Sequence, residues 1–485
     1  MSELLIKSFY KGFLWTGFQT IGSKVIALVT QLILAWLLLP EDFGKVSIAT
    51  SLTSIVFLIQ ALGLSDVLVS RSHMYFKILD LAKSLAFLTS VLCLIFTFIL
   101  AFLGGALYDD ITITYLILIF AICVPFNAMT VVADAKLRID LKFKQLSLLR
   151  VGELVLTNIL LVVFVLLKLG VYSFVVAPVL VSLLRYIAIH KLAGVKFLFT
   201  WRLNHYKYLL RNSLWGFVHN LFQTIIRQSD YLIVGFFVSA QAVGIYFLGY
   251  SLSVQVIALL VGSLSPVFFP VLKTIPRTEI NTVKNILLKV VTVFSLFGMP
   301  FALLQAALAK PLMGIFLDEK WSASIQIVQI LSIGIGFNVS ATVWAVALRW
   351  QDAFKKQAIL SLIAAVVFVL NVAVATYHFG LLGTAYAVTL FHIVFSLYLL
   401  KVSLKTFEID FTNILSVTLK YFFISLVTFS ACYFFTIYLK VNNWLSIVTC
   451  GFVPLLAYFS ILYKFDFKSK ELLSGLLLKI KINEK

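Results

Sequence analysis

The chain has 485 residues, of which 62% are hydrophobic and 12% are charged, and its formal net charge is +19. No soluble core could bury so much apolar surface, so the composition excludes a soluble globular protein. The positive charge lies mostly between apolar segments, which favours membrane topology and anionic lipid contact over nucleic-acid binding.

Fourteen apolar stretches predict an all-α integral membrane protein with fourteen transmembrane helices. Each has about 19–29 residues, enough to cross a hydrocarbon core of roughly 30 Å at about 1.5 Å per residue. The stretches are continuously apolar, which favours helices over the alternating strands of a membrane barrel. In chain order, the predicted spans are Gly12–Leu39, Phe43–Val69, Leu81–Leu103, Ile111–Val132, Leu148–Leu167, Val171–Ile189, Ser213–Val238, Val243–Val271, Ile286–Ala309, Ile325–Leu348, Gln357–Tyr377, Leu381–Leu400, Ile414–Leu439 and Trp444–Tyr463.

Most of the 39 Lys and Arg residues lie before the first span, after the even-numbered spans and in the C-terminal tail. The positive-inside rule therefore places both termini and these loops in the cytoplasm. The first apolar run is too long for the core of a cleaved signal peptide, so none is expected. Between spans 4 and 5, Leu137, Leu141 and Leu146 alternate with basic residues, which predicts an interfacial helix on the lipid headgroups.

Weak internal similarity at an offset of 200 residues relates spans 1–2 to spans 7–8. Six spans separate the two copies, so they have the same orientation, as in a parallel transporter repeat with binding near the repeat interface. The predicted domains are two six-helix lobes, 1–198 and 199–402, followed by two helices and a basic cytoplasmic tail, 403–485. The matched pairs include Leu14-Trp15 with Leu214-Trp215, Gly44 with Gly244, and Ser51-Leu52 with Ser251-Leu252.

Charged side chains within the spans are the first functional candidates, because a charge in the membrane is costly. Lys24 lies deep in span 1, and Arg227 and Asp230 share one face of span 7. The repeat places Lys24 and Arg227 at similar depths, which predicts a cationic cavity for an anionic group such as a diphosphate. The alternative is that Arg227 and Asp230 neutralise each other as a structural ion pair.

Glu153 and Arg185 complete the candidate set of cavity residues, in spans 5 and 6. Each lies near the predicted cytoplasmic end of its span, so the alternative is that both reach toward the headgroups. Asp134, at the cytoplasmic end of span 4, is expected to be solvated. Prolines within spans, such as Pro125, are expected to kink helices.

Enzyme motifs are missing from the sequence: it has no nucleotide-binding P-loop, no HExxH and no GxSxG. Asp109-Asp110 could form a metal pair, but it has no acidic or His neighbours, which favours a solvated loop. We therefore expect no enzymatic activity and no cofactor. Energy for uphill movement would come from an ion gradient, the membrane potential or consumption of the product.

Several segments in order along the chain resemble the polysaccharide flippases of the WzxC type, which belong to the multidrug/oligosaccharidyl-lipid/polysaccharide exporter superfamily. They cover almost the whole chain. The segments are Leu39-Pro40-Glu41-Asp42-Phe43-Gly44, the basic run 136–144, Arg227-Gln228-Ser229-Asp230-Tyr231, Val243-Gly244-Ile245-Tyr246, Asp318-Glu319-Lys320-Trp321 and Gly380-Leu381-Leu382-Gly383.

The resemblance implies a twelve-helix core with two extra helices in a bacterial plasma (inner) membrane. It also implies flipping of undecaprenyl-diphosphate-linked oligosaccharides for a surface polysaccharide, with membrane lipids and the pathway's polymerase and glycosyltransferases as partners. It agrees with a cationic cavity containing Lys24 and Arg227. The alternatives are a drug/cation antiporter of the same superfamily and a membrane-embedded polymerase or transferase. The short loops argue against the last of these.

Overall fold

The computed structural model describes residues 22–61, 68, 75–195, 206–273, 275–276, 278–438 and 444–466, and over these ranges the regular structure is helical throughout. Ten helical segments in these ranges are long and apolar enough to cross a membrane, and a shorter apolar helix covers Gly22–Leu37. The prediction of a multi-pass helical membrane protein is therefore confirmed. The exact count of fourteen spans stays a prediction.

The chain divides into two compact units, and each is described by itself. Unit 1 contains Met1–Leu248 and Asp352–Thr384, and unit 2 contains Gly249–Gln351 and Ala385–Lys485. Two helices, α10 (Ala240–Lys273) and α14 (Phe354–Leu404), contribute residues to both units. The lobe boundaries expected at residues 198 and 402 stay a prediction.

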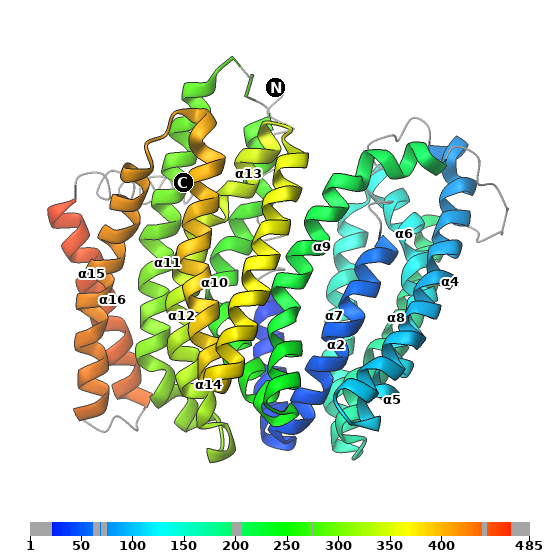
Figure 1. The fold of residues 1–485 in the computed structure, drawn as a ribbon, viewed down its shortest axis with the longest axis horizontal. Helices are drawn as coiled ribbons and strands as arrows, with labels where there is room; N and C mark the ends of the chain where they lie inside the picture. The colour runs from blue at the N-terminus through cyan, green and yellow to red at the C-terminus, as the bar shows by residue number, and fades with distance from the viewer. Residues whose placement is uncertain are drawn as a thin grey trace, which may run out of the picture. The chain divides into compact units, whose positions relative to one another are not determined.

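In unit 1, α2 packs against α4 and α9, while α8 packs against α6 and α7 (Figure 1). Asp110 caps α5 by accepting a hydrogen bond from the Thr112 backbone N–H, and Gly194 ends α8 with a left-handed φ of 63°. Apart from α10 and α14, the labelled helices of unit 1 are α2 (Pro40–Ala61), α4 (Tyr75–Leu107), α5 (Ile111–Ala121), α6 (Cys123–Ile139), α7 (Phe143–Leu166), η2 (Gly170–Tyr172), α8 (Ser173–Ala193) and α9 (Tyr206–Phe237).

Two helix breaks agree with the sequence. The predicted span 111–132 is interrupted at Ile122, three residues before Pro125, whose missing N–H leaves the Ala121 carbonyl without its helical donor. Within α14, Gly380 has φ 60° and ψ −145°, a backbone conformation suited to glycine. Gly380 therefore divides α14 at the boundary between the predicted spans Gln357–Tyr377 and Leu381–Leu400.

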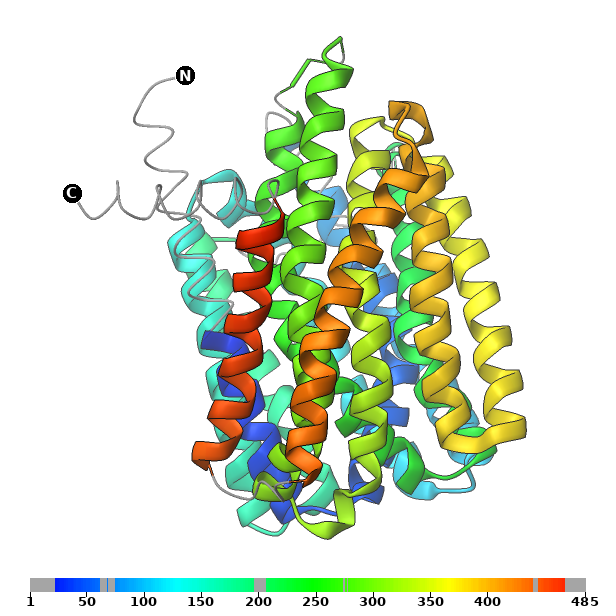
Figure 2. The same ribbon diagram turned by 90° about the vertical axis from the view of Figure 1, so that its left-hand side faces the viewer.

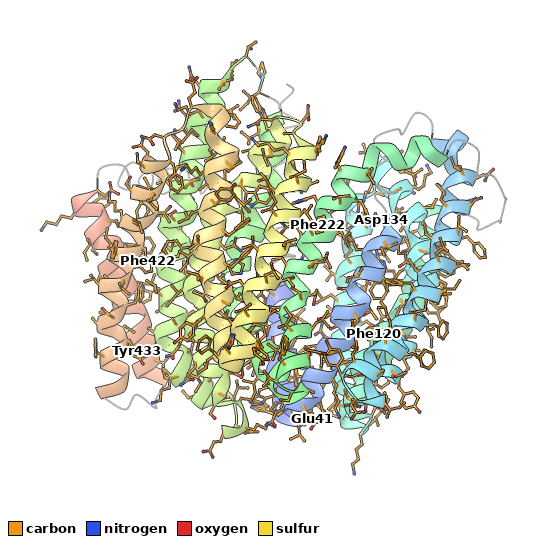
Figure 3. All side chains as sticks on the ribbon, viewed as in Figure 1. Glu41, Phe120, Asp134, Phe222, Phe422 and Tyr433 are labelled. Carbon is orange, nitrogen blue, oxygen red and sulfur yellow. The ribbon has the colours of Figure 1, made fainter. Side chains whose placement is uncertain are left out.

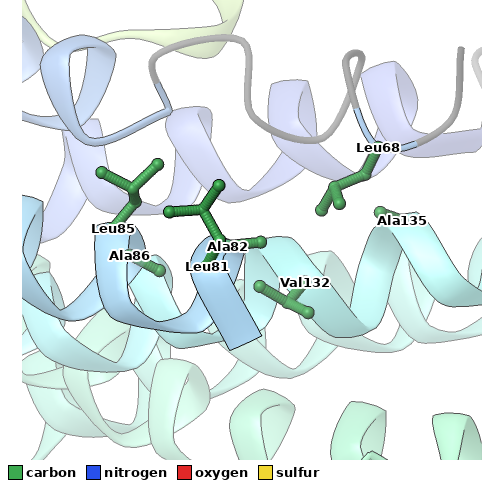
Figure 4. Packing of buried hydrophobic residues seen from close by; sticks show 7 residues of the cluster. All are labelled: Leu68, Leu81, Ala82, Leu85, Ala86, Val132 and Ala135. Atoms are coloured by element: carbon green, nitrogen blue, oxygen red, sulfur yellow. The ribbon is translucent and has the colours of Figure 1, made fainter. Parts of the chain in front are cut away.

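The inner core of unit 1 contains small and branched side chains packed between α4 and α6 (Figure 4). A second cluster corrects one expectation, because Leu137 and Leu146 are buried in it with Ile189 of α8 instead of lying on headgroups. The turn after α6, where Leu141 has φ 55°, folds α7 back so that both leucines face the protein. Leu141 alone is largely exposed.

In unit 2, the long helix α11 packs against α12 and α15, and α15 packs against α16 (Figure 2). Tyr458 of α16 is fully buried and donates a hydrogen bond to the Leu296 carbonyl of α11 at 3.0 Å, which joins the C-terminal pair to the rest of the unit. The elements are α11 (Ile280–Phe316), η3 (Glu319–Trp321), α12 (Ala323–Ala341), α13 (Val343–Trp350), η4 (Lys405–Phe407), α15 (Phe411–Tyr438) and α16 (Trp444–Phe465).

Candidate functional site

The first turns of α2 and α10 cross within unit 1 at a pair of glycines. A Cβ added to Gly44 would lie 1.7 Å from the Ala240 carbonyl oxygen, and a Cβ added to Gly244 would lie 1.7 Å from the Pro40 carbonyl oxygen. Real Cβ contacts essentially never fall below 3.0 Å, so only glycine fits at either position. We call this contact the glycine crossing.

The glycine crossing is reciprocal. Residues 40 and 44 contact residues 240 and 244, and the two backbone nitrogens Gly44 N and Gly244 N lie at the same 3.1 Å from the opposite added Cβ. An approximate two-fold relation between the two helix starts produces such a contact. The offset of 200 between the matched residues therefore has a structural counterpart at this point of the chain.

Asp230 of α9 is 1% exposed and bonds to α10 two residues beyond Gly244 of the glycine crossing. The Tyr246 hydroxyl of α10 donates a hydrogen bond to Asp230 Oδ2 at 2.9 Å, and the Tyr231 backbone N–H donates to Asp230 Oδ1 at 3.0 Å. Arg227, one turn earlier, is exposed and donates to Thr224 Oγ1 at 3.3 Å. The structural ion pair considered for Arg227 and Asp230 is not formed, because Asp230 bonds to α10 instead.

Lys24 lies half-buried on the helix Gly22–Leu37. Within the described ranges, neither Lys24 nor Arg227 forms an ion pair with a carboxylate.

Glu153 of α7 and Arg185 of α8 are brought together. Arg185 Nη1 donates to Glu153 Oε1 at 3.1 Å, and the two side chains are 31% and 23% exposed. The pair lies in a groove of about 390 Å³ between the two helices. Sequence reasoning selected both residues but did not pair them, because the contact depends on the antiparallel register of α7 and α8.

Asp134 of α6 differs from the expectation that it is solvated. Its carboxylate is buried and bonds Arg138 Nε at 2.7 Å and Arg150 Nη2 of α7 at 3.4 Å. The spacing of four residues between Asp134 and Arg138 was a usable signal, because residues i and i+4 are neighbours on a helix. The contact with Arg150 follows from the turn that folds α7 back.

At the opposite end of the unit 1 helices from Asp134 lies Glu41 (Figure 3). Lys45 bonds both Glu41 at 2.8 Å and Asp110 at 3.0 Å. Burial opposes ionisation of Asp110, but hydrogen bonds from Thr112 and Lys45 outweigh it and lower the pKa of this carboxyl. Asp110 is therefore an ion-pairing helix cap, and no group of three or more acidic, His or Cys side chains in the described ranges could hold a metal ion.

A buried polar cluster that sequence reasoning missed links α9 to the first half of α14. His219 Nδ1 lies 2.6 Å from Ser361 Oγ, and His219 Nε2 lies 3.0 Å from Gln357 Nε2. Because the Ser361 hydroxyl donates to the Gln357 carbonyl, the neutral ring donates from Nδ1 and accepts at Nε2. Ser361 follows His219 by 142 residues, so no local motif in the sequence could have revealed the cluster.

These features define a multi-pass helical membrane fold with two equivalent helix starts in close contact. The chain belongs to the polysaccharide biosynthesis protein family, which matches residues 33–326, more than half of its length. Among curated proteins, no match was found.

Solved structures share the fold. The chain is similar to the lipid II flippase MurJ in an inward closed conformation, with a TM-score of 0.76 and 17% identity over 93% of this chain and 99% of that one. It is also similar to an inward-facing multidrug resistance MATE transporter of the MOP superfamily, with a TM-score of 0.62 and 13% identity over 81% and 98% of the chains. A mutant of the Vibrio cholerae MATE transporter VcmN gives a TM-score of 0.55 and 12% identity over 81% and 96%. The family match confirms the predicted polysaccharide family, and these structures show the fold.

Proposed function

We propose that the protein flips undecaprenyl-diphosphate-linked oligosaccharide units across a bacterial plasma membrane for the synthesis of a surface polysaccharide such as O-antigen, capsule or exopolysaccharide. The observation that carries this proposal is the polysaccharide biosynthesis family match on a fold similar to a lipid II flippase over 93% of the chain. The distribution of Lys and Arg supports an orientation with both termini in the cytoplasm.

Movement occurs by alternating access, without covalent chemistry. The glycine crossing supports this mechanism, because two equivalent helix starts in backbone contact provide a compact pivot. Asp230 and Tyr246 hold α9 against α10 beside that pivot.

Lys24 and Arg227 bind the substrate's diphosphate. The support is that both lie well inside apolar segments, and that neither pairs with a carboxylate in the described ranges. Glu153 and Arg185 lie outside this phosphate site in our proposal, because they line a groove between α7 and α8 that neither Lys24 nor Arg227 lines.

The test is to express Lys24→Ala and Arg227→Ala in a strain that lacks the gene, and to measure surface polysaccharide and inner-leaflet lipid-linked glycan. A hydrogen bond to a charged group contributes roughly 1.5–3 kcal/mol, so each variant should lower the transport rate by about tenfold or more. Lys310→Ala is the matched control, because Lys310 is an exposed cation on α11 and should retain full transport.

Two outcomes separate the parts of the proposal. Full transport by both variants at normal protein levels contradicts the phosphate site but leaves flipping intact. Deletion of the gene without accumulation of a lipid-linked glycan contradicts flipping itself.

Drug/cation antiport is a second candidate, favoured by the similarity to MATE transporters. It predicts that expression lowers drug accumulation in a host without its own pumps. The family match favours the saccharide substrate.

A further inference from the structure

The groove between α7 and α8 is the feature of unit 1 that the proposed transport cycle does not use. It has a volume of about 390 Å³, within the range of roughly 300–1,000 Å³ typical of small-molecule sites. Its lining is apolar apart from Glu153, Arg185 and Gln145. Only 11% of the α7 span is buried in the described ranges, the lowest share of the ten spans, so the groove opens to the side of the bundle.

The ion pair lies inside the helices α7 and α8 and not at their ends. Glu153 is ten residues after the start of α7, roughly 15 Å along the helix axis, and Arg185 is eight residues before the end of α8, roughly 12 Å. The apolar residues Leu148 and Leu156 flank the pair along α7. A partly exposed ion pair at this depth is costly in hydrocarbon unless a further polar group approaches it.

Arg185 has donors to spare. A guanidinium carries five N–H groups, and within the described ranges Glu153 accepts from one of them. A phosphate oxygen satisfies the others better than any group in the groove, because guanidinium and phosphate match in charge and geometry. The leucines on both sides of the pair provide the surface for an acyl chain.

The ends of α7 and α8 beside the groove carry exposed Lys144 and Lys191. These cations lie on the side that faces the cytoplasm in the proposed orientation, where they favour an anionic headgroup. A glycan fits poorly, because Gln145 is the only uncharged polar side chain in the lining.

We propose that the α7–α8 groove is a binding site for an anionic phospholipid of the inner leaflet, with the phosphate on Arg185 and an acyl chain along the leucines.

Gly152 allows a specific test. It lines the groove, and a Cβ added there meets no atom within 4 Å, so the side chain of Gly152→Leu begins in open space and fills the groove. Gly216→Leu is the matched control, because Gly216 is equally unobstructed and lies at a similar distance from the start of α9. Arg185→Gln removes the guanidinium while leaving the groove open.

Native mass spectrometry of the purified full-length chain, titrated with phosphatidylglycerol, phosphatidylethanolamine or undecaprenyl phosphate, measures the binding. Wild type and Gly216→Leu should prefer phosphatidylglycerol. Gly152→Leu should bind it about tenfold more weakly, and Arg185→Gln should lose the preference over phosphatidylethanolamine.

Three results overturn the proposal: equal binding of both phospholipids by wild type, unchanged phosphatidylglycerol binding by Gly152→Leu, or tighter groove-dependent binding of undecaprenyl phosphate. The last would assign the groove to the transported lipid. The first two results leave flipping untouched, and the glycan accumulation assay tests flipping separately.

Discussion

Two helix pairs in unit 1 use glycine in opposite ways. At the crossing of α2 and α10, Gly44 and Gly244 let two backbones approach until no Cβ fits. Between α7 and α8, Gly152 leaves a space that nothing in its surroundings fills. The comparison teaches that a glycine in a membrane helix indicates either the closest packing or an open space beside the helix, and that the opposite helix decides between them.

The largest expected difference in stability comes from replacing glycine by alanine in each of the two helix pairs. Gly44→Ala and Gly244→Ala should destabilise the protein by the upper end of the roughly 1–3 kcal/mol typical of overpacking, or more, because a backbone carbonyl cannot rotate away. Gly152→Ala and Gly216→Ala should be neutral or slightly stabilising, since alanine favours helix. Thermal unfolding in detergent measures all four.

The same experiment examines the reciprocity of the glycine crossing. Gly44→Ala and Gly244→Ala should lower the melting temperature by similar amounts. A drop at one position alone, or equal drops at Gly44 and Gly152, would contradict the contrast between the two helix pairs.

Loss of a polar contact in either helix pair should have an intermediate effect on stability. Tyr246→Phe leaves the buried Asp230 without its hydroxyl donor, which should cost about 1–3 kcal/mol. Arg185→Gln should cost less, because Glu153 is 31% exposed and the glutamine amide can still donate a hydrogen bond to its carboxylate. Thermal unfolding of both variants orders the two effects.

A double-mutant cycle provides the control for the Asp230 contact. When Asp230→Asn is already present, Tyr246→Phe should have a smaller effect than in the wild type. Strict additivity of the two substitutions would show that their side chains do not interact.

The smallest expected effect lies at the end of the unit 1 helices, at Asp110. Because its pKa is lowered in the folded protein, its contribution is fully present above the unfolded value of about 3.9 and is lost as the pH falls through the folded pKa. The contribution should be about 1 kcal/mol or less, since the ion pair with Lys45 is partly exposed.

Melting temperatures of wild type and Asp110→Asn between pH 7 and pH 3 measure this contribution. The difference between the two melting temperatures should be constant near neutral pH and should shrink at acid pH. Asp109→Asn is the control, because Asp109 is exposed and asparagine tolerates its φ of 48°. A difference that grows toward acid pH would contradict the assignment.

Sequence reasoning performed differently on spans and on sites. The break before Pro125 follows from proline chemistry and is present, and the turn at Gly380 lies where two predicted spans meet. The solvation expected for Asp134 was wrong, and Leu137 and Leu146 were wrongly expected on headgroups. These errors share a cause, because the turn at Leu141 packs α7 onto the end of α6, and no periodicity in either segment shows that packing.

The sequence by itself determined that this is a helical membrane protein of the polysaccharide biosynthesis family, because apolar length and family-specific segments are local properties of the chain. It also matched Gly44 with Gly244. Only the tertiary structure decided that these two glycines touch, that Asp230 bonds Tyr246 and not Arg227, and that Glu153 meets Arg185 in a groove. Such contacts depend on which helix faces which and at what register, and no single segment encodes that information.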